Sequence, residues 1–167
     1  MHLVYGSWAD AEALVGTVIA EQAGADPVNV PMVRQFLESL EWDSPAATEG
    51  IAPFSMYMTF GMPAYWQPGG PPLPEHSIAP FPFGRVPAPG SAILATGTDV
   101  EFHEPMRTGD RIVTTWRLTC VTRKRLRLGD GAFMEFETVY RNQKQETVSI
   151  ERTTVFRYEP DETGVRS

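Results

Sequence analysis

The chain has 167 residues, of which 42% are hydrophobic and 21% are charged, a composition typical of an ordinary globular protein with one domain. Its net charge of -7 and its pI near 4.9 argue against a general nucleic-acid-binding protein. Neither a long apolar run nor a basic N-terminal segment followed by an apolar block is present, so we expect no membrane span and no secretory signal. The expectation is a cytoplasmic protein whose residues 1–167 form a single domain.

Cys120 is the only cysteine in the chain. An internal disulfide is therefore impossible, and a zinc site built on cysteine is excluded because such sites need several ligands at short spacing. We expect the protein to carry neither a metal ion nor a cofactor of its own.

The first third of the chain favours helices. Residues 8–23 begin with weak helical character and then become apolar. Residues 29–42 give the clearest helix, with Asn29 as a capping residue and Pro31 in the first turn. Its apolar positions recur at helical spacing and predict one buried face, formed by Val33, Phe36, Leu37 and Leu40. Residues 43–45 then end the helix.

Residues 51–66 are apolar nearly all round and predict a helix buried on all sides. A proline-rich segment follows, and nine of the fifteen prolines lie between Pro63 and Pro89. Such a segment cannot form a regular helix or a central strand, and a loop of this length is usually a lid or a binding loop. We expect the loop, about residues 63–90, to pack through its aromatic side chains Trp66, Phe81 and Phe83.

From residue 91 the hydrophobic period changes to two, which predicts four half-buried strands. In the last strand, the alternation places Val148 and Phe156 on the buried face and Glu151 and Arg157 on the polar face. Turn-like segments at residues 107–110, 128–131 and 141–146 separate the strands. The expected fold is α+β, a long antiparallel meander wrapped around the apolar helix.

Five segments in this order resemble the MaoC-like acyl dehydratases of the hotdog superfamily, of the N-terminal, fatty-acid-synthase-dehydratase-like type. They are "LVGTVI", "VNVPMVRQFLESLEWDSP", "IAPFSMYM", "VEFHEPMRTGDRI" and "GDGAFMEFETVYRNQKQETV". The resemblance covers about residues 13–158. It implies a hotdog fold and an acyl thioester of coenzyme A as the substrate, with lipid or steroid metabolism as the setting.

Hydratases of this family resemble one another at a Gly-Asp-x-Asn-Pro-x-His phrase, whose Asp and His hold and activate a water molecule. The reaction needs a base and an acid within reach of that water. When the phrase is laid on this chain by its proline, residues 41–47 read "EWDSPAA". Trp42 then takes the Asp position and Ala47 takes the His position, so the resemblance implies that the catalytic dyad is missing.

Some hydratases of this group pair two different hotdog subunits, of which one carries the dyad and the other supplies part of the acyl and coenzyme A groove. This chain resembles the second kind, as in the heteromeric hydratases of steroid side-chain degradation. The implied partner is a second MaoC-like subunit, with a homodimer as the alternative. The residues expected to line the acyl groove are Phe54, Met58, Met62 and Trp66.

Asp43 and His103 are the remaining candidates for acid–base chemistry. Asp43 is one position away from the Asp of the phrase, and His103 falls on the polar face of the first long strand with Asp99 and Glu101. A histidine on a polar strand face is more often a surface or interface residue. His2 and His76 have no carboxylate at a readable spacing.

One basic cluster interrupts the acidic sequence, at Arg123, Lys124, Arg125 and Arg127. Paired cationic side chains suit the phosphates of coenzyme A. The alternative is an ordinary solvated strand end.

Four hypotheses for the function stay open. The first is the dyad-lacking subunit of a heteromeric enoyl-CoA hydratase, and the second is a homodimeric hydratase or dehydratase with relocated catalytic residues. A hotdog thioesterase is the third, and it has only Ser55 and Thr59 as polar groups in the apolar helix. The fourth is a module that binds acyl-CoA without chemistry.

Overall fold

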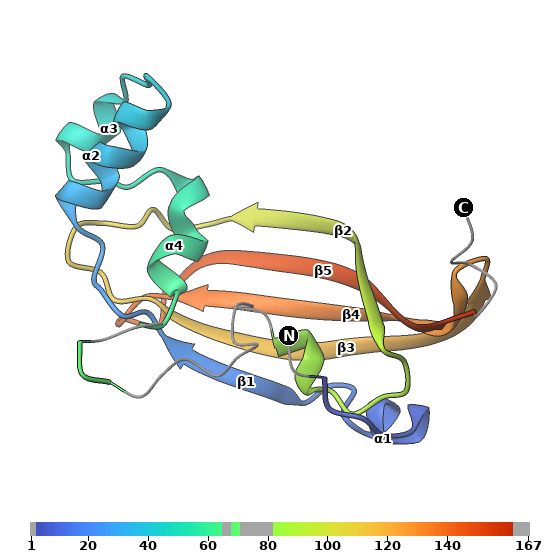
Figure 1. The fold of residues 1–167 in the computed structure, drawn as a ribbon. Helices are drawn as coiled ribbons and strands as arrows, with labels where there is room; N and C mark the ends of the chain where they lie inside the picture. The colour runs from blue at the N-terminus through green and yellow to red at the C-terminus, as the bar shows by residue number, and fades with distance from the viewer. Residues whose placement is uncertain (1–2, 65–67, 71–81, 162–167) are drawn as a thin grey trace.

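The computed structural model describes residues 3–64, 68–70 and 82–161. They form a five-stranded sheet with the strand order β1-β3-β4-β5-β2, in which all neighbours are antiparallel (Figure 1). The strands are β1 (Val18–Ala23), β2 (Ala92–Phe102), β3 (Val113–Leu126), β4 (Gly129–Arg141) and β5 (Thr147–Pro160).

The sheet confirms only part of the predicted meander. β3, β4 and β5 follow one another through short turns, but β2 pairs with β5 and not with β3. The segment 103–112 between β2 and β3 is long enough to carry the chain across the sheet, whereas two residues join β3 to β4. The prediction also has no strand at residues 18–23, where β1 pairs with β3.

The helices are short and lie at the two ends of the sheet. They are α1 (Trp8–Ala13), α2 (Val30–Ser39), α3 (Pro45–Thr48), η1 (Phe54–Met56), α4 (Tyr57–Gly61) and η2 (Pro82–Arg85). In Figure 1, α2 and α3 extend beyond one end of the sheet and α4 covers one of its faces near that end. In the described part of the chain, no helix is long and apolar enough to cross a membrane.

α2 confirms the expected helix and its cap. The side-chain oxygen of Asn29 accepts a hydrogen bond of 3.0 Å from the backbone N–H of Met32, and Pro31 lies in the first turn. Val33 is buried, but Leu40 lies just past the end of the helix and is 55% exposed. The predicted apolar face therefore ends one turn earlier than its periodicity suggested.

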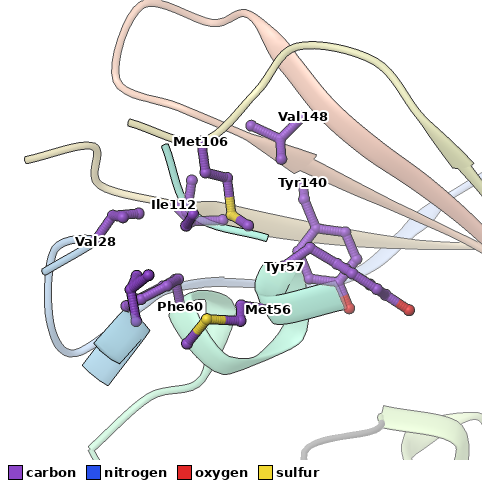
Figure 2. Packing of buried hydrophobic residues seen from close by; sticks show 10 residues of the cluster. Val28, Met56, Tyr57, Phe60, Met106, Ile112, Tyr140 and Val148 are labelled. Carbon is purple, nitrogen blue, oxygen red and sulfur yellow. The ribbon is translucent and has the colours of Figure 1, made fainter. Parts of the chain in front are cut away.

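The buried helix expected over residues 51–66 is much shorter in the structure. Pro53 precedes η1, and α4 ends at Gly61, two residues before Pro63. Each proline disfavours helical backbone at the residue before it, and Pro63 also lacks the N–H that a continuing helix would need. Met56, Tyr57 and Phe60 nevertheless fill the core as predicted (Figure 2).

The buried side chains form two clusters on the sheet. The first surrounds α4 and contains Phe60, Met106, Ile112, Tyr140 and Val148 among others (Figure 2). The second joins α1 and the segment around η2 to the middle of β3, β4 and β5. In this second cluster the ring of Phe83 lies 4.7 Å from that of Phe136, which confirms the expected packing for this aromatic of the proline-rich loop. Trp66 and Phe81 lie outside the described residues.

The face assignment for β5 was wrong. Ser149, Glu151, Thr153 and Arg157, which follow the predicted polar face, are all buried. β5 is an inner strand between β4 and β2, and Val148 and Phe156 on its other face are buried as well. Alternation of polar and apolar residues identifies the core face only where the second face meets water.

Arg157 clamps the N-terminal segment and residues 86–90 to β5. Its guanidinium is 0% exposed and donates hydrogen bonds to the backbone carbonyls of Val4, Val86, Ala88 and Gly90, at 2.7 to 3.2 Å. Burial lowers the pKa of this guanidinium. The five N–H groups of arginine explain how one side chain can satisfy four acceptors.

Candidate functional site

A groove of about 500 Å³ lies between α2, α3 and the turn at residues 107–110. The turn is held in place by two contacts. The N–H of Arg107 donates to the Asp110 carboxylate at 2.7 Å, and the N–H of Thr108 donates to the carbonyl of Gly50 at 2.8 Å. Most of the groove's lining is apolar, and it includes Val33, Leu37, Trp42, Ala47 and Ile51.

The end of α2 brings Trp42 to this groove. Glu41 has φ of +51°, a left-handed conformation that is uncommon for a residue with a side chain. It reverses the chain, and the N–H of Trp42 donates back to the carbonyl of Leu37 at 3.0 Å. Trp42 is left 49% exposed at the groove.

Trp42, Asp43 and Ala47 line the same groove. Trp42 and Ala47, the two positions that the resemblance assigns to the dyad, therefore lie at one groove, across the start of α3. Neither an indole nor a methyl group exchanges a proton near neutral pH. That these two positions replace a catalytic dyad stays a prediction from the resemblance.

The charged groups at the groove belong to its rim. Arg34 and Glu38 form an exposed pair with Nε and Oε1 3.6 Å apart, and Glu41 and Asp43 are also exposed. No histidine, cysteine or lysine lines this groove among the described residues.

The structure does not bring Asp43 and His103 together. His103 follows β2, and its Nε2 lies 3.8 Å from the carboxylate of Glu101, with both side chains exposed. It does not line the groove. The exposed side chain agrees with the expectation of a surface or interface histidine, and a role as a catalytic base stays a prediction.

The residues expected to line the acyl groove are divided between two places. Met58 and Met62 line a small cavity of about 10 Å³ between α4 and the sheet. Phe54 is partly exposed, and its ring lies 5.1 Å from that of Phe102 at the end of β2. None of these three residues lines the groove beside Trp42, and Trp66 lies outside the described residues. Their role in binding an acyl group stays a prediction.

The basic cluster lies at the opposite end of the sheet from the groove. Arg123, Lys124 and Arg125 are exposed near the end of β3, whereas the groove adjoins the turn that precedes β3. The guanidinium of Arg125 is already paired with both oxygens of Asp161, at 2.8 and 2.9 Å. Within one chain, the cluster is therefore not beside the groove. Binding of coenzyme A phosphates by this cluster stays a prediction.

One polar cluster was not predicted. The carboxylate of Glu151 is buried under α4 and accepts hydrogen bonds from Tyr57 at 3.1 Å, Tyr140 at 3.3 Å and Thr153 at 2.8 Å. Burial and the neighbouring carboxylate raise the pKa of both tyrosines. The run of polar residues at 149, 151 and 153 is the signal that could have identified the cluster, had β5 been recognised as an inner strand.

The described residues hold no group of three His, Cys, Asp or Glu side chains arranged for a metal ion. The Glu151 cluster consists of one carboxylate and three hydroxyls.

Residues 13–151 match the family described as "FAS1-like, dehydratase domain region". A curated relative, the probable enoyl-CoA hydratase alpha subunit of Thermomonospora curvata, is 28% identical over 165 residues, covering 91% of this chain and 52% of the relative. The chain therefore spans about half the length of the curated relative that it matches.

Two solved structures show the same fold. The ChsH1-ChsH2 complex from Mycobacterium tuberculosis superposes with a TM-score of 0.66 at 21% identity, over 93% of this chain and 91% of that chain. The MaoC-like dehydratase from Rhodospirillum rubrum superposes with a TM-score of 0.55 at 18% identity, over 85% and 92%. With its long antiparallel sheet across α4 and the family match over most of its length, the chain belongs to the FAS1-like dehydratase family of MaoC-like hotdog proteins.

Proposed function

We propose that this chain is the dyad-lacking subunit of a heteromeric enoyl-CoA hydratase. Its partner, a second MaoC-like hotdog subunit, supplies the Asp and His that add water to an α,β-unsaturated acyl thioester. The chain itself contributes part of the surface that binds the acyl-CoA and holds the complex together. Coenzyme A enters only as part of the substrate, and no further cofactor is needed for hydration.

The observation that carries this proposal is that Trp42 and Ala47 both line one apolar groove. A hydratase needs an acid and a base at this place. In this groove of about 500 Å³, the two positions that the resemblance assigns to the dyad hold side chains without an acid or a base. A binding surface without chemistry is what a subunit that relies on a partner's dyad would retain.

The free edge of β2 supports assembly with another hotdog subunit. β2 is the outermost strand on its side of the sheet, and no described strand pairs with its outer edge. Its Leu94 and Phe102 side chains are about half exposed. An exposed edge of eleven residues is a ready template for a strand of a second subunit. The relative from Thermomonospora curvata is itself called an alpha subunit, which agrees with a partner.

The test compares the chain alone with the chain co-expressed with a dyad-bearing MaoC-like protein encoded beside it. Hydration is followed as the loss of enoyl-thioester absorbance for several acyl-CoA substrates. We expect turnover only for the mixed complex, and its loss when the partner's Asp or His is replaced by Asn or Ala. Turnover by this chain alone would overturn the proposal.

A homodimeric hydratase with relocated catalytic residues is the second candidate. Its candidate catalytic residue is the buried Glu151. The Thr153 hydroxyl donates to this carboxylate and lies 3.3 Å from the hydroxyl of Thr98 on β2, the edge strand at which a second copy would pair. This candidate predicts turnover by the chain alone that is lost in Glu151→Gln, whereas the heteromer predicts no such activity to lose.

A further inference from the structure

The cavity under the C-terminal end of α4 has the size of one water molecule. Its volume is about 10 Å³, and a site needs roughly that much space for the centre of one water. Met58 and Gly61 border it from the helix, and Thr114 and Trp116 border it from β3.

Two buried polar atoms of this lining have no hydrogen-bond partner among the described residues. They are the hydroxyl oxygen of Thr114, a residue that is 0% exposed, and the indole nitrogen of Trp116, a residue that is 3% exposed. An indole N–H can only donate, so it requires an acceptor. Native proteins rarely leave such groups unsatisfied when buried, because their hydration is lost without compensation.

The neighbouring polar side chains give these two atoms no hydrogen bond. The side-chain amide of Gln22, directly opposite Thr114 on β1, donates to the carbonyl of Gly61 at 3.0 Å. Tyr140, opposite Thr114 on β4, points its hydroxyl to Glu151 at 3.3 Å. An acceptor for the Trp116 indole N–H and a partner for the Thr114 hydroxyl must therefore come from something that enters the cavity.

Gly61 keeps this space open. A β-carbon at this position would lie 2.6 Å from the Thr114 hydroxyl and 2.9 Å from the ring of Tyr140. Any side chain here would press directly on the cavity wall. Thr114 and Trp116 are two residues apart in β3, so both side chains project from the same face of the strand toward this gap.

We propose that the cavity is a binding site for one uncharged oxygen atom, which accepts a hydrogen bond from the Trp116 indole and exchanges one with the Thr114 hydroxyl. No charged side chain lines the cavity, and an ion there would lose its hydration without a counter-charge. Two sources provide such an oxygen. One is a trapped water molecule, and the other is a carbonyl or hydroxyl oxygen on the acyl group of a bound thioester, which would enter past the flexible Met58. The second source rests on the proposed function.

The first experiment detects the oxygen through the Trp116 indole. The chain has four tryptophans, and Trp116→Phe identifies the indole N–H signal of Trp116 in an ¹⁵N-labelled protein. We expect a cross-relaxation signal between this N–H and a long-lived water, and electron density for one oxygen within hydrogen-bond distance of both side chains in a crystal. Thr114→Ser, which keeps the hydroxyl, should retain the signal, and the isosteric Thr114→Val should lose it or shorten the water's residence.

The second experiment separates the two sources. The mixed complex, with this chain ¹⁵N-labelled, is titrated with two acyl-CoA esters of equal chain length, one fully apolar and one with a ketone near the end of the acyl chain. If the ketone ester alone removes the water signal while shifting the Trp116 resonance, the acyl group supplies the oxygen. If the water signal persists with both bound esters, water is the source.

Two results together would overturn the oxygen site. The free protein would show neither a water signal nor density between Thr114 and Trp116, and neither bound ester would shift the Trp116 resonance. If neither ester changes any resonance of the mixed complex, acyl-CoA binding and with it the proposed function fails. The search for a bound water in the free chain tests the oxygen site independently of that result.

Discussion

The hydroxyl of Tyr57, the first residue of α4, donates a hydrogen bond of 3.1 Å to the buried carboxylate of Glu151 on β5. These residues are 94 positions apart in the chain, and Tyr140 from β4 donates to the same oxygen. Figure 2 shows the two tyrosine side chains next to each other with their hydroxyls on the same side. Because Glu151 is only 4% exposed, these donors replace the water that would otherwise hydrate its charge.

Tyr57→Phe and Tyr140→Phe should each destabilise the fold. Each removes one hydrogen bond to a buried carboxylate, a loss of about 1.5–3 kcal/mol. The free energy of unfolding from urea titrations measures this, and a double-mutant cycle should show coupling, since both hydroxyls share one oxygen. Tyr5→Phe is the control, because Tyr5 is largely exposed. Additive losses would contradict the shared acceptor.

The same pair predicts sensitivity to alkaline pH. The folded state raises the pKa of Tyr57 and Tyr140 above the ordinary value of 10.0, chiefly through burial. Their contribution to stability is therefore complete below pH 10 and declines as the pH rises above it, since the unfolded chain releases these protons first. We expect the free energy of unfolding to fall above pH 10 by up to about 1.4 kcal/mol per pH unit for each tyrosine. The double Phe variant should show a flatter profile over the same range.

Glu41→Gly should stabilise the protein. Glu41 holds φ of +51° at the end of α2, where glycine avoids the steric cost of a side chain. We expect a gain of about 0.5–1 kcal/mol in the free energy of unfolding. Glu41→Ala is the matched control, because it removes the carboxylate but keeps the β-carbon. A similar gain from alanine would assign the effect to charge and not to backbone strain.

Arg157→Lys should destabilise the fold nearly as much as Arg157→Leu. Four carbonyls accept hydrogen bonds from the guanidinium, and a compact ammonium with three donors cannot reach all of them. We expect losses of at least about 3 kcal/mol, because buried acceptors are left unpaired. Thermal or urea unfolding measures the loss. The exposed Arg152→Lys is the control, and a mild effect of Arg157→Lys would show that one or two of the carbonyls suffice.

Blocking the groove should impair the mixed hydratase complex. Thr48 is exposed and lines the groove, so Thr48→Trp should raise KM without unfolding the chain. Glu49→Trp, one residue further along and outside the groove lining, is the matched control. Under the proposed function the partner supplies the acid and the base, so Asp43→Asn should leave kcat within about twofold. A large loss from Asp43→Asn would assign the chemistry to this chain.

The sequence predicts elements well where one local signal dominates. The cap at Asn29 and the apolar spacing of Val33 and Leu37 locate α2, and the short turns locate the hairpins from β3 to β5. The pairing of β2 with β5 could not be predicted, because periodicity gives the faces of a strand and not its neighbours. The Glu151 cluster was missed for the same reason, since its partners come from β4 and α4.

The groove shows a second limit of prediction from the sequence, which concerns residues that are distant in the chain. Residues 42–47 resemble a phrase of the family in sequence, but only the fold brings Thr108, about 60 residues later, to the same groove. The short central helix also followed from particular residues, Pro53 and Pro63, that were visible in the sequence. Their effect was underestimated because the apolar character of the segment continues past them.

The clamp made by Arg157 bears on the order in which the chain assembles during synthesis. Val4 leaves the ribosome early, but the side chain that holds its carbonyl is made about 150 residues later. Until then the N-terminal segment lacks its anchor, and β2 likewise waits for β5. A nascent chain of this protein should therefore remain sensitive to proteases near residue 4 and along β2 until β5 has emerged. Such long-range closure also favours slow folding.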